Sequence, residues 1–349
     1  MRKVYVMCPA YLSTGGTELL HQLVYKLINV FNINAYIFYP NIEWKFEFNP
    51  TPSKFVKYIG NNWVENVEDS SDYIIIIPET MSKMIEVYQN AELWIWWLSI
   101  DNFFTMIGKS YTYRKFTKPN IEWRFRKLFN LKPYKNLSAI LHKRNIKFQL
   151  YQSEYAKLFL KKLRVHNILP LSDYISNSLL STCSERNQVR VNQVLYNPVK
   201  GFEVTSQLIK SFPEIKWVPI IKLKSEEVSK LMLCSKIYID FGNHPGKDRI
   251  PREAILNGCC IIVNKQGASG NENDIKIPEE FKIGDPLKEQ NRIISLIEKI
   301  FSCYDDQYLK FENYLAEITK EEDVFEKEIE ELIKHINNCS NSQFFGLGT

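Results

Sequence analysis

A group of charged side chains that could bind a ligand lies in the stretch DFGNHPGKDRIPREAILNGCCII, from Asp240 to Ile262. A glycine-rich turn and the start of a predicted helix separate two apolar runs there. The turn and helix start hold the following polar residues: His244, Lys247, Asp248, Arg249, Arg252 and Glu253. Cations beside a helix N-terminus suit phosphate groups, and a carboxylate can accept hydrogen bonds from both hydroxyls of a ribose. A glutamate that only complements the helix dipole would explain Glu253 but not the whole group.

Two other junctions have the same form of a strand, a turn with glycine and a helix. Lys200 and Gly201 follow the strand-like QVLYNP and precede GFEVTSQLIKSF, and a lysine there is placed to bind a diphosphate. Gly15 and Gly16 in PAYLSTGGTELL would let the main chain approach a ligand closely, although a plain turn capped by Thr17 is an equal alternative.

Strand-like and helix-like segments alternate along the chain in two blocks. Continuous apolar runs such as YIIIIP are typical of parallel strands covered on both faces. We therefore predict the α/β class, with two doubly wound Rossmann-like domains facing across a cleft. The expected boundaries are residues 1–184 for the first domain, 185–190 for a linker, and 191–349 for a second domain that ends in helices.

The composition is that of a soluble globular protein, with 45% hydrophobic residues, 24% charged residues and a net charge of +5. The longest apolar runs fall far short of the ~20 residues that span a bilayer. Seven cysteines without CxxC spacing favour neither a disulfide framework nor a zinc site, so we expect a cytoplasmic protein.

The order of motifs from Tyr196 to Gly270 resembles the nucleotide-sugar half of GT-B fold glycosyltransferases, most of all the retaining family four (glycosyl transferases group 1). The elements that carry the resemblance are the KG pair at Lys200, SEEVSKLMLCSKIYID, REAILNGCCIIVN and the loop KQGASGNEND. The N-terminal STGGTELLHQL is similar to that family's glycine-rich first loop. The resemblance implies transfer of a sugar from a nucleoside diphosphate sugar to a hydroxyl of a glycan or glycolipid, as in O-antigen or capsule synthesis.

The chain departs from the family pattern at two positions, as expected of a divergent branch. Glu253 matches the second glutamate of the family's E-x(7)-E motif, which binds the donor ribose, but Pro245 stands at the first. Leu195 stands where an arginine is common, and Lys247 or Arg249 could supply that charge. The implied donor-binding residues are Gly15, Gly16, Lys200, Gly201, His244, Gly246, Lys247, Asp248, Arg249, Arg252, Glu253, Gly267, Ala268 and Ser269.

Stabilising the leaving diphosphate is the main chemical demand of such a reaction. The sequence has no convincing Asp-x-Asp motif to hold a divalent ion, so we expect neither metal nor cofactor, and Lys200, Arg249 and Glu253 are the catalytic candidates. Glu79, Ser99 and Asp101 follow buried strands of the first domain and should meet the acceptor. Asp101 could act as a base in an inverting reaction, bind sugar hydroxyls in a retaining one, or only cap a helix.

A basic segment interrupts the first domain at residues 109–146. Eleven lysines and arginines lie between Lys109 and Arg144 against one acidic residue, Glu122, and aromatic residues are interleaved with them. Such a segment suits the anionic inner face of a membrane, at about 1 kcal/mol per cation near the surface. Single-stranded nucleic acid and a plain solvated excursion are the weaker alternatives.

Two other functions fit the same sequence. One is a degenerate transferase that binds a sugar nucleotide or polyanion without turnover, which the missing first glutamate favours. The other is a GT-B fold sugar-nucleotide epimerase, although the sequence shows no dedicated acid/base pair for it.

Overall fold

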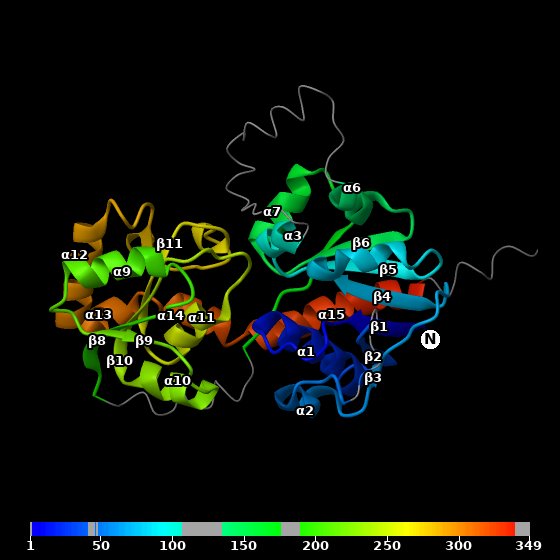
Figure 1. Cartoon of the computed structure of the whole chain (residues 1–349), viewed down its shortest axis with the longest axis horizontal. Helices are drawn as coiled ribbons and strands as arrows, with labels where there is room; N and C mark the ends of the chain where they lie inside the picture. The colour runs from blue at the N-terminus through cyan, green and yellow to red at the C-terminus, as the bar shows by residue number, and fades with distance from the viewer. Residues whose placement is uncertain (1, 41–45, 47, 107–134, 176–188, 339–349) are drawn as a thin grey trace, which may run out of the picture. The chain divides into compact units, whose positions relative to one another are not determined.

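The computed structural model describes residues 2–40, 46, 48–106, 135–175 and 189–338. The chain forms two compact units (Figure 1), the first made of Met1–Asp173 with Asp323–Thr349 and the second of Tyr174–Glu322. The first boundary precedes the expected linker at 185–190. The last described residues, from Asp323 to Asn338, belong to the first unit, whereas the sequence placed them in the second. Within the described ranges, no helix is long and apolar enough to span a bilayer.

The first unit is built on a parallel sheet with the strand order β3-β2-β1-β4-β5-β6-β7. Its strands are β1 Lys3–Met7, β2 Ala35–Phe38, β3 Trp63–Val64, β4 Tyr73–Pro78, β5 Glu92–Trp97, β6 Ile146–Tyr151 and β7 Ile168–Pro170. Its helices are α1 Gly15–Asn29, η1 Ser53–Phe55, α2 Val56–Ile59, η2 Glu79–Glu86, α3 Ile100–Met106, α6 Lys135–His142, α7 Glu154–Lys162 and most of α15 Glu321–Asn338. The order reverses between β1 and β4, which is the topological switch point of this sheet.

The tryptophans of β5 lie in the core of the first unit. Trp96 and Trp97 are fully buried, and their ring N–H groups donate to the Leu171 carbonyl at 2.9 Å and to Gln149 at 2.7 Å. The segment between β4 and β5 begins with η2, a 3-10 helix broken at Met81. The tighter turn suits the short return from β4 to β5.

The second unit is built on a parallel sheet with the strand order β12-β11-β10-β8-β9. Its strands are β8 Val191–Tyr196, β9 Trp217–Pro219, β10 Ser235–Asp240, β11 Cys260–Asn264 and β12 Lys282–Ile283. Its helices are α9 Phe202–Ser211, α10 Ser225–Leu233, α11 Arg249–Leu256, η4 Ala268–Gly270, η5 Glu279–Phe281, α12 Gln290–Ser302, α13 Tyr304–Leu309 and α14 Glu312–Ile318. The switch point lies between β8 and β10. Both units therefore confirm the predicted α/β class with doubly wound sheets.

Candidate functional site

The turn after β8 places Lys200 at the switch point of the second sheet. Gly201 has a φ of 64° and precedes α9. A Cβ on Gly201 would lie 2.4 Å from the carbonyl carbon of Phe241, so only glycine lets this turn pack on the end of β10. Lys200 therefore lies directly beside the loop that follows β10, as the strand order requires.

The loops after β10 and β11 are tied together by main-chain contacts. The Asn264 side-chain amide donates to the carbonyls of Phe241 and Gly242 at 2.7 and 2.9 Å. The His244 carbonyl accepts a hydrogen bond from the Ala268 N–H at 2.8 Å. A Cβ on Gly267, whose φ is 64°, would lie 1.9 Å from that same carbonyl oxygen. Gly267 and Ala268 thus hold the His244 loop in place.

A row of alternating charges crosses the switch point. Lys200 Nζ lies 2.6 Å from Asp248 Oδ2, and the same oxygen lies 2.8 Å from His244 Nδ1. His244 Nε2 lies 3.7 Å from Asp240 Oδ1 at the end of β10. His244 is fully buried, whereas the side chains of Lys200 and Asp248 are 33% and 22% exposed. The outer end of the row is therefore accessible to a ligand.

Neighbouring charges decide the ionisation of this row. Burial lowers the pKa of His244, but Asp248 and Asp240 outweigh burial and raise the pKa above its usual value. Burial raises the pKa of Asp248, but His244 and Lys200 outweigh it and lower the pKa. Both shifts favour the charged forms, so the row alternates between carboxylates and cations.

Two residues that were predicted to bind the sugar donor, Lys247 and Arg252, form ion pairs with Glu321. Arg252 is fully buried, with Nη1 2.5 Å from Glu321 Oε2, and Lys247 Nζ lies 2.6 Å from Glu321 Oε1. Arg252 also donates to the main-chain carbonyls of Lys247 and Asp248 at 3.2 Å each. These contacts give Arg252 a structural role in shaping the loop, in place of the direct donor contact expected from the sequence.

Arg249 and Glu253 lie in the first turns of α11. Arg249 Nε is 3.7 Å from Glu253 Oε1, and their side chains are 15% and 20% exposed. The Glu253 carboxylate is thus partly screened by a cation of its own helix. Gly246 and Ser269 are buried, and the Ser269 hydroxyl donates to the Asn264 carbonyl at 2.6 Å. Ser269 therefore stabilises the loop after β11.

One group of described residues could offer three ligand atoms to a metal ion. Asp240, His244 and Asp248 bring such atoms within 4.8 Å of one another. The Lys200 ammonium already lies against the accessible carboxylate of this group, and Asp240 accepts from the Gly242 N–H at 3.0 Å and the Tyr238 hydroxyl at 3.1 Å. A divalent ion would have to displace the lysine, so these residues fit an ammonium better than a metal.

The glycine pair of the first unit is not the turn that the sequence suggested. Thr14 is the N-cap of α1 and forms a capping box with Thr17, so Gly15 and Gly16 occupy the first turn of the helix. A Cβ on Gly16 would meet Leu98 Cδ1 at an ordinary 3.7 Å. The fold itself therefore does not require glycine at Gly16.

Two buried carboxyls lie near the switch point of the first sheet. Asp101 is 4% exposed and accepts a hydrogen bond from the Tyr155 hydroxyl at 3.2 Å. Glu79 is 1% exposed and accepts from the Leu98 N–H at 2.9 Å. Burial raises the pKa of Glu79 to about 8, although main-chain N–H groups act in the opposite direction. The partner of Asp101 could not be read from the sequence, because Tyr155 lies 54 positions away.

The largest part of the basic segment, residues 109–134, lies outside the described residues. Its predicted contact with a membrane is therefore neither supported nor contradicted by the fold.

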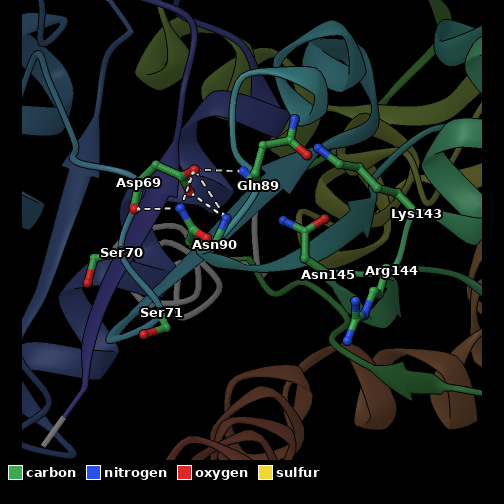
Figure 2. Close-up of a pocket in the computed structure, with 8 residues that line it drawn as sticks. All are labelled: Asp69, Ser70, Ser71, Gln89, Asn90, Lys143, Arg144 and Asn145. Carbon is green, nitrogen blue, oxygen red and sulfur yellow. Dashed lines mark hydrogen bonds between the residues drawn. The ribbon is translucent and has the colours of Figure 1, made fainter.

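A separate hollow of about 800 Å³ lies in the first unit (Figure 2). Its lining residues are Asp69, Ser70, Ser71, Gln89, Asn90, Lys143, Arg144 and Asn145. The Asp69 carboxylate accepts from the N–H groups of Gln89 and Asn90 at 2.8 to 3.1 Å (Figure 2). It also accepts from the N–H group of Ala91 at 2.9 Å. These residues precede β4, β5 and β6, so the hollow is at the amino ends of the strands. The switch point of the first sheet is at the carboxyl ends of the strands. The hollow is at their other ends and does not belong to the candidate site.

Comparison with known proteins identifies the class of fold. Neither a family model nor a curated protein matches the chain in sequence. Sucrose-phosphate synthase from Thermosynechococcus elongatus is similar in structure, with a TM-score of 0.62 and 10% identity over 97% of this chain and 100% of that one. HepE of Anabaena, solved with UDP-glucose, has a TM-score of 0.57 and 12% identity over 96% and 100%. TarM of S. aureus, solved with fondaparinux, alpha-GlcNAc-glycerol and UDP, has a TM-score of 0.51 and 14% identity over 78% of this chain.

The chain spans only 56% of the length of TarM. Sucrose-phosphate synthase and TarM are GT-B glycosyltransferases. The chain thus has the GT-B fold, which confirms the fold expected from the resemblance of the Tyr196–Gly270 motifs.

Proposed function

We propose that the chain is a glycosyltransferase that uses a nucleoside diphosphate sugar as donor. The observation that carries this proposal is the position of Lys200 at the switch point of a GT-B unit, beside the N-terminus of α9 and the charged loop before α11. An ammonium and two helix N-termini at one point suit a diphosphate. TarM and HepE, solved with UDP and UDP-glucose, support the same donor class.

The leaving diphosphate gains negative charge as the bond to the sugar breaks. In the proposed reaction, Lys200 and Arg249 stabilise that charge, together with the N–H groups at the start of α9 and α11. Glu253 accepts hydrogen bonds from the ribose diol, which requires its carboxylate to turn from Arg249 toward the nucleotide. The reaction proceeds without a divalent ion and retains the configuration of the sugar, and the acceptor hydroxyl binds to the first unit.

A panel of UDP-, GDP-, ADP- and dTDP-sugars tests the proposal, with hydrolysis or transfer measured with and without EDTA. NMR of the product gives the configuration of the new bond. Lys200→Met and Glu253→Gln should each weaken nucleotide binding by more than tenfold, about 1.4 kcal/mol. Lys276→Met, in an exposed ion pair with Glu317, is the matched control and should bind as the parent does. Parent-like affinity in both site variants would sink the assignment.

A binding protein without turnover is the alternative that a specific observation favours. Pro245 stands where the family pattern has a glutamate, and Arg252 is fully occupied by Glu321. Tight nucleotide binding without hydrolysis or transfer for any sugar of the panel would favour this alternative. An epimerase would instead convert the free sugar nucleotide in the absence of an acceptor, which the same NMR assay detects.

The acceptor is proposed to be a glycan or lipid-linked sugar of a surface polysaccharide, such as O-antigen, capsule or lipopolysaccharide. The basic segment at 109–146 carries the charge needed to hold the protein at the cytoplasmic face of an anionic membrane. Cosedimentation with vesicles containing phosphatidylglycerol, which should weaken as salt increases, tests this part. An oligonucleotide shift in the same buffers tests nucleic acid binding, which we do not expect.

A further inference from the structure

A lysine that binds a phosphate must first be ordered, because its side chain carries about 2 kcal/mol of rotamer entropy. Lys200 is one-third exposed, yet its ammonium lies 2.6 Å from Asp248. We propose that Asp248 is a positioning residue that orients Lys200, and that the buried His244 fixes Asp248 in that role. This inference rests on the proposed function, in which Lys200 binds the donor diphosphate.

The carboxylate of Asp248 does not do what its place in the helix predicts. Asp248 is the N-cap of α11, where an aspartate usually accepts a hydrogen bond from a main-chain N–H of the first turn. Here no side-chain cap bond forms. One oxygen, Oδ2, instead lies 2.6 Å from Lys200 Nζ and 2.8 Å from His244 Nδ1. The Asp248 carboxylate therefore contacts both His244 and Lys200 and does not cap the helix.

His244 is held through its main chain and its Nε2 atom, whereas Nδ1 meets Asp248 as a close charge contact without hydrogen-bond geometry. Its carbonyl accepts from the Ala268 N–H at 2.8 Å. Its ring is fully buried, with Nε2 3.4 Å from the Asp240 carbonyl oxygen and 3.7 Å from Asp240 Oδ1. Asp240 itself ends β10 and accepts from the Gly242 N–H at 3.0 Å. The row thus begins at Asp240 on the central strand of the sheet and ends at the accessible ammonium of Lys200. Each side chain of the row contacts the next one.

Charge alone predicts the opposite effect of Asp248 on a diphosphate. A carboxylate beside Lys200 repels an incoming anion, so its removal should tighten binding if only Coulomb attraction matters. If Asp248 orients the lysine, its removal should weaken binding although the site becomes more positive. The sign of the change separates the two roles.

Titration of UDP into the full chain tests the proposal. Asp248→Asn should weaken UDP affinity about tenfold, and Asp248→Glu should recover part of the loss. Glu203→Gln is the matched control, because Glu203 is an exposed acid in the first turn of α9, and its removal should leave affinity unchanged or slightly higher. In a Lys200→Met background, Asp248→Asn should change affinity by less than about twofold. Unchanged or tighter binding by Asp248→Asn overturns the positioning role.

Nitrogen NMR of the lysine ammonium groups gives a readout that does not need a nucleotide. The Lys200 signal should be observed in the parent chain and in Glu203→Gln, where the ion pair slows proton exchange. It should be lost in Asp248→Asn and in His244→Gln, with circular dichroism confirming that both variants are folded. A Lys200 signal that survives His244→Gln overturns the part assigned to His244.

Two further outcomes are decisive. A parent chain that binds no nucleoside diphosphate contradicts the proposed function, while the NMR comparison still decides whether Asp248 orients Lys200. Loss of the Lys200 signal on addition of one equivalent of Zn²⁺ would make Asp240, His244 and Asp248 a metal site, and would overturn the proposal.

Discussion

Arg252 and Glu321 form a buried ion pair, with Nη1 2.5 Å from Oε2, although they are 69 positions apart in the chain. Lys247 Nζ lies 2.6 Å from the other oxygen of the same carboxylate. One glutamate at the start of α15 therefore fixes two cations of the loop before α11. The shape of the candidate donor loop depends on a residue far outside the motif.

Loss of this carboxylate should destabilise the second unit. Glu321→Gln leaves the fully buried Arg252 without its anion, and breaking a buried pair in this way costs about 3–5 kcal/mol. Urea unfolding monitored by circular dichroism measures the change. Lys276→Met breaks an exposed pair with Glu317, whose side chains are 42% and 48% exposed, and should change stability by less than about 1 kcal/mol. Equal effects of the two variants would show that burial of the pair does not matter.

A side chain at Gly267 should distort the loop that carries His244. Gly267→Ala would place a Cβ 1.9 Å from the His244 carbonyl oxygen, at a φ of 64°. We expect the unfolding free energy to fall by more than the ~1–2 kcal/mol of a left-handed non-glycine residue, and UDP affinity to fall with it. Gly60→Ala is the control, because Gly60 has a φ of 55° but open space around it. An equal loss of stability in both variants would contradict the prediction, because it would mean that the His244 loop can move away from the new Cβ at no cost in free energy.

The fold could be predicted from the alternation of apolar and helical patterns, because parallel strands buried on both faces read as continuous apolar runs. The unit against which α15 packs could not be predicted in this way. Its apolar spacing predicts a helix with one buried face, but does not say which sheet covers that face. In the structure, Phe325 of this helix stacks with Trp96 of the first unit at a ring distance of 6.5 Å. Such a contact, far apart in sequence, leaves no local signal.

The candidate site was predictable in part for the same reason. Lys200 and Gly201 follow a strand and precede a helix, and that local order is enough to place them at the carboxyl end of a parallel strand. The strand order, which puts this strand at the switch point, comes from the structure. Arg252 is four residues from Asp248, yet its side chain is buried against Glu321. Residue type and spacing do not distinguish an arginine that faces a ligand from one that holds a loop. The role depends on which acidic residue the arginine contacts, and here that residue is Glu321, far away in the sequence.

A base in an inverting reaction is one of the roles that the sequence leaves open for Asp101, and the burial of this carboxyl leads to a testable expectation. The carboxyl is 4% exposed and accepts a hydrogen bond from Tyr155. We expect Asp101→Asn to slow transfer by less than tenfold, because an acceptor hydroxyl cannot reach the carboxyl without a rearrangement of the first unit. General bases usually contribute 10²–10⁴-fold. A loss in that range, with Tyr155→Phe close to the parent, would restore Asp101 as the base.

Glu79 should make the stability of the first unit depend on pH. Burial raises the pKa of its carboxyl to about 8 in the folded chain, against 4.5 as its usual value. Between these two values the folded state keeps a proton that the unfolded state releases, so the unfolding free energy should fall as pH rises from about 4.5 to 8. The expected change is on the order of a few kcal/mol. Urea unfolding at several pH values, compared between the parent and Glu79→Gln, isolates this contribution. The buried His21, whose pKa is lowered to about 4, acts in the opposite direction in both proteins and cancels from the difference. A difference between the two proteins that stays constant over this range would contradict a protonated Glu79 beneath the turn at Leu98.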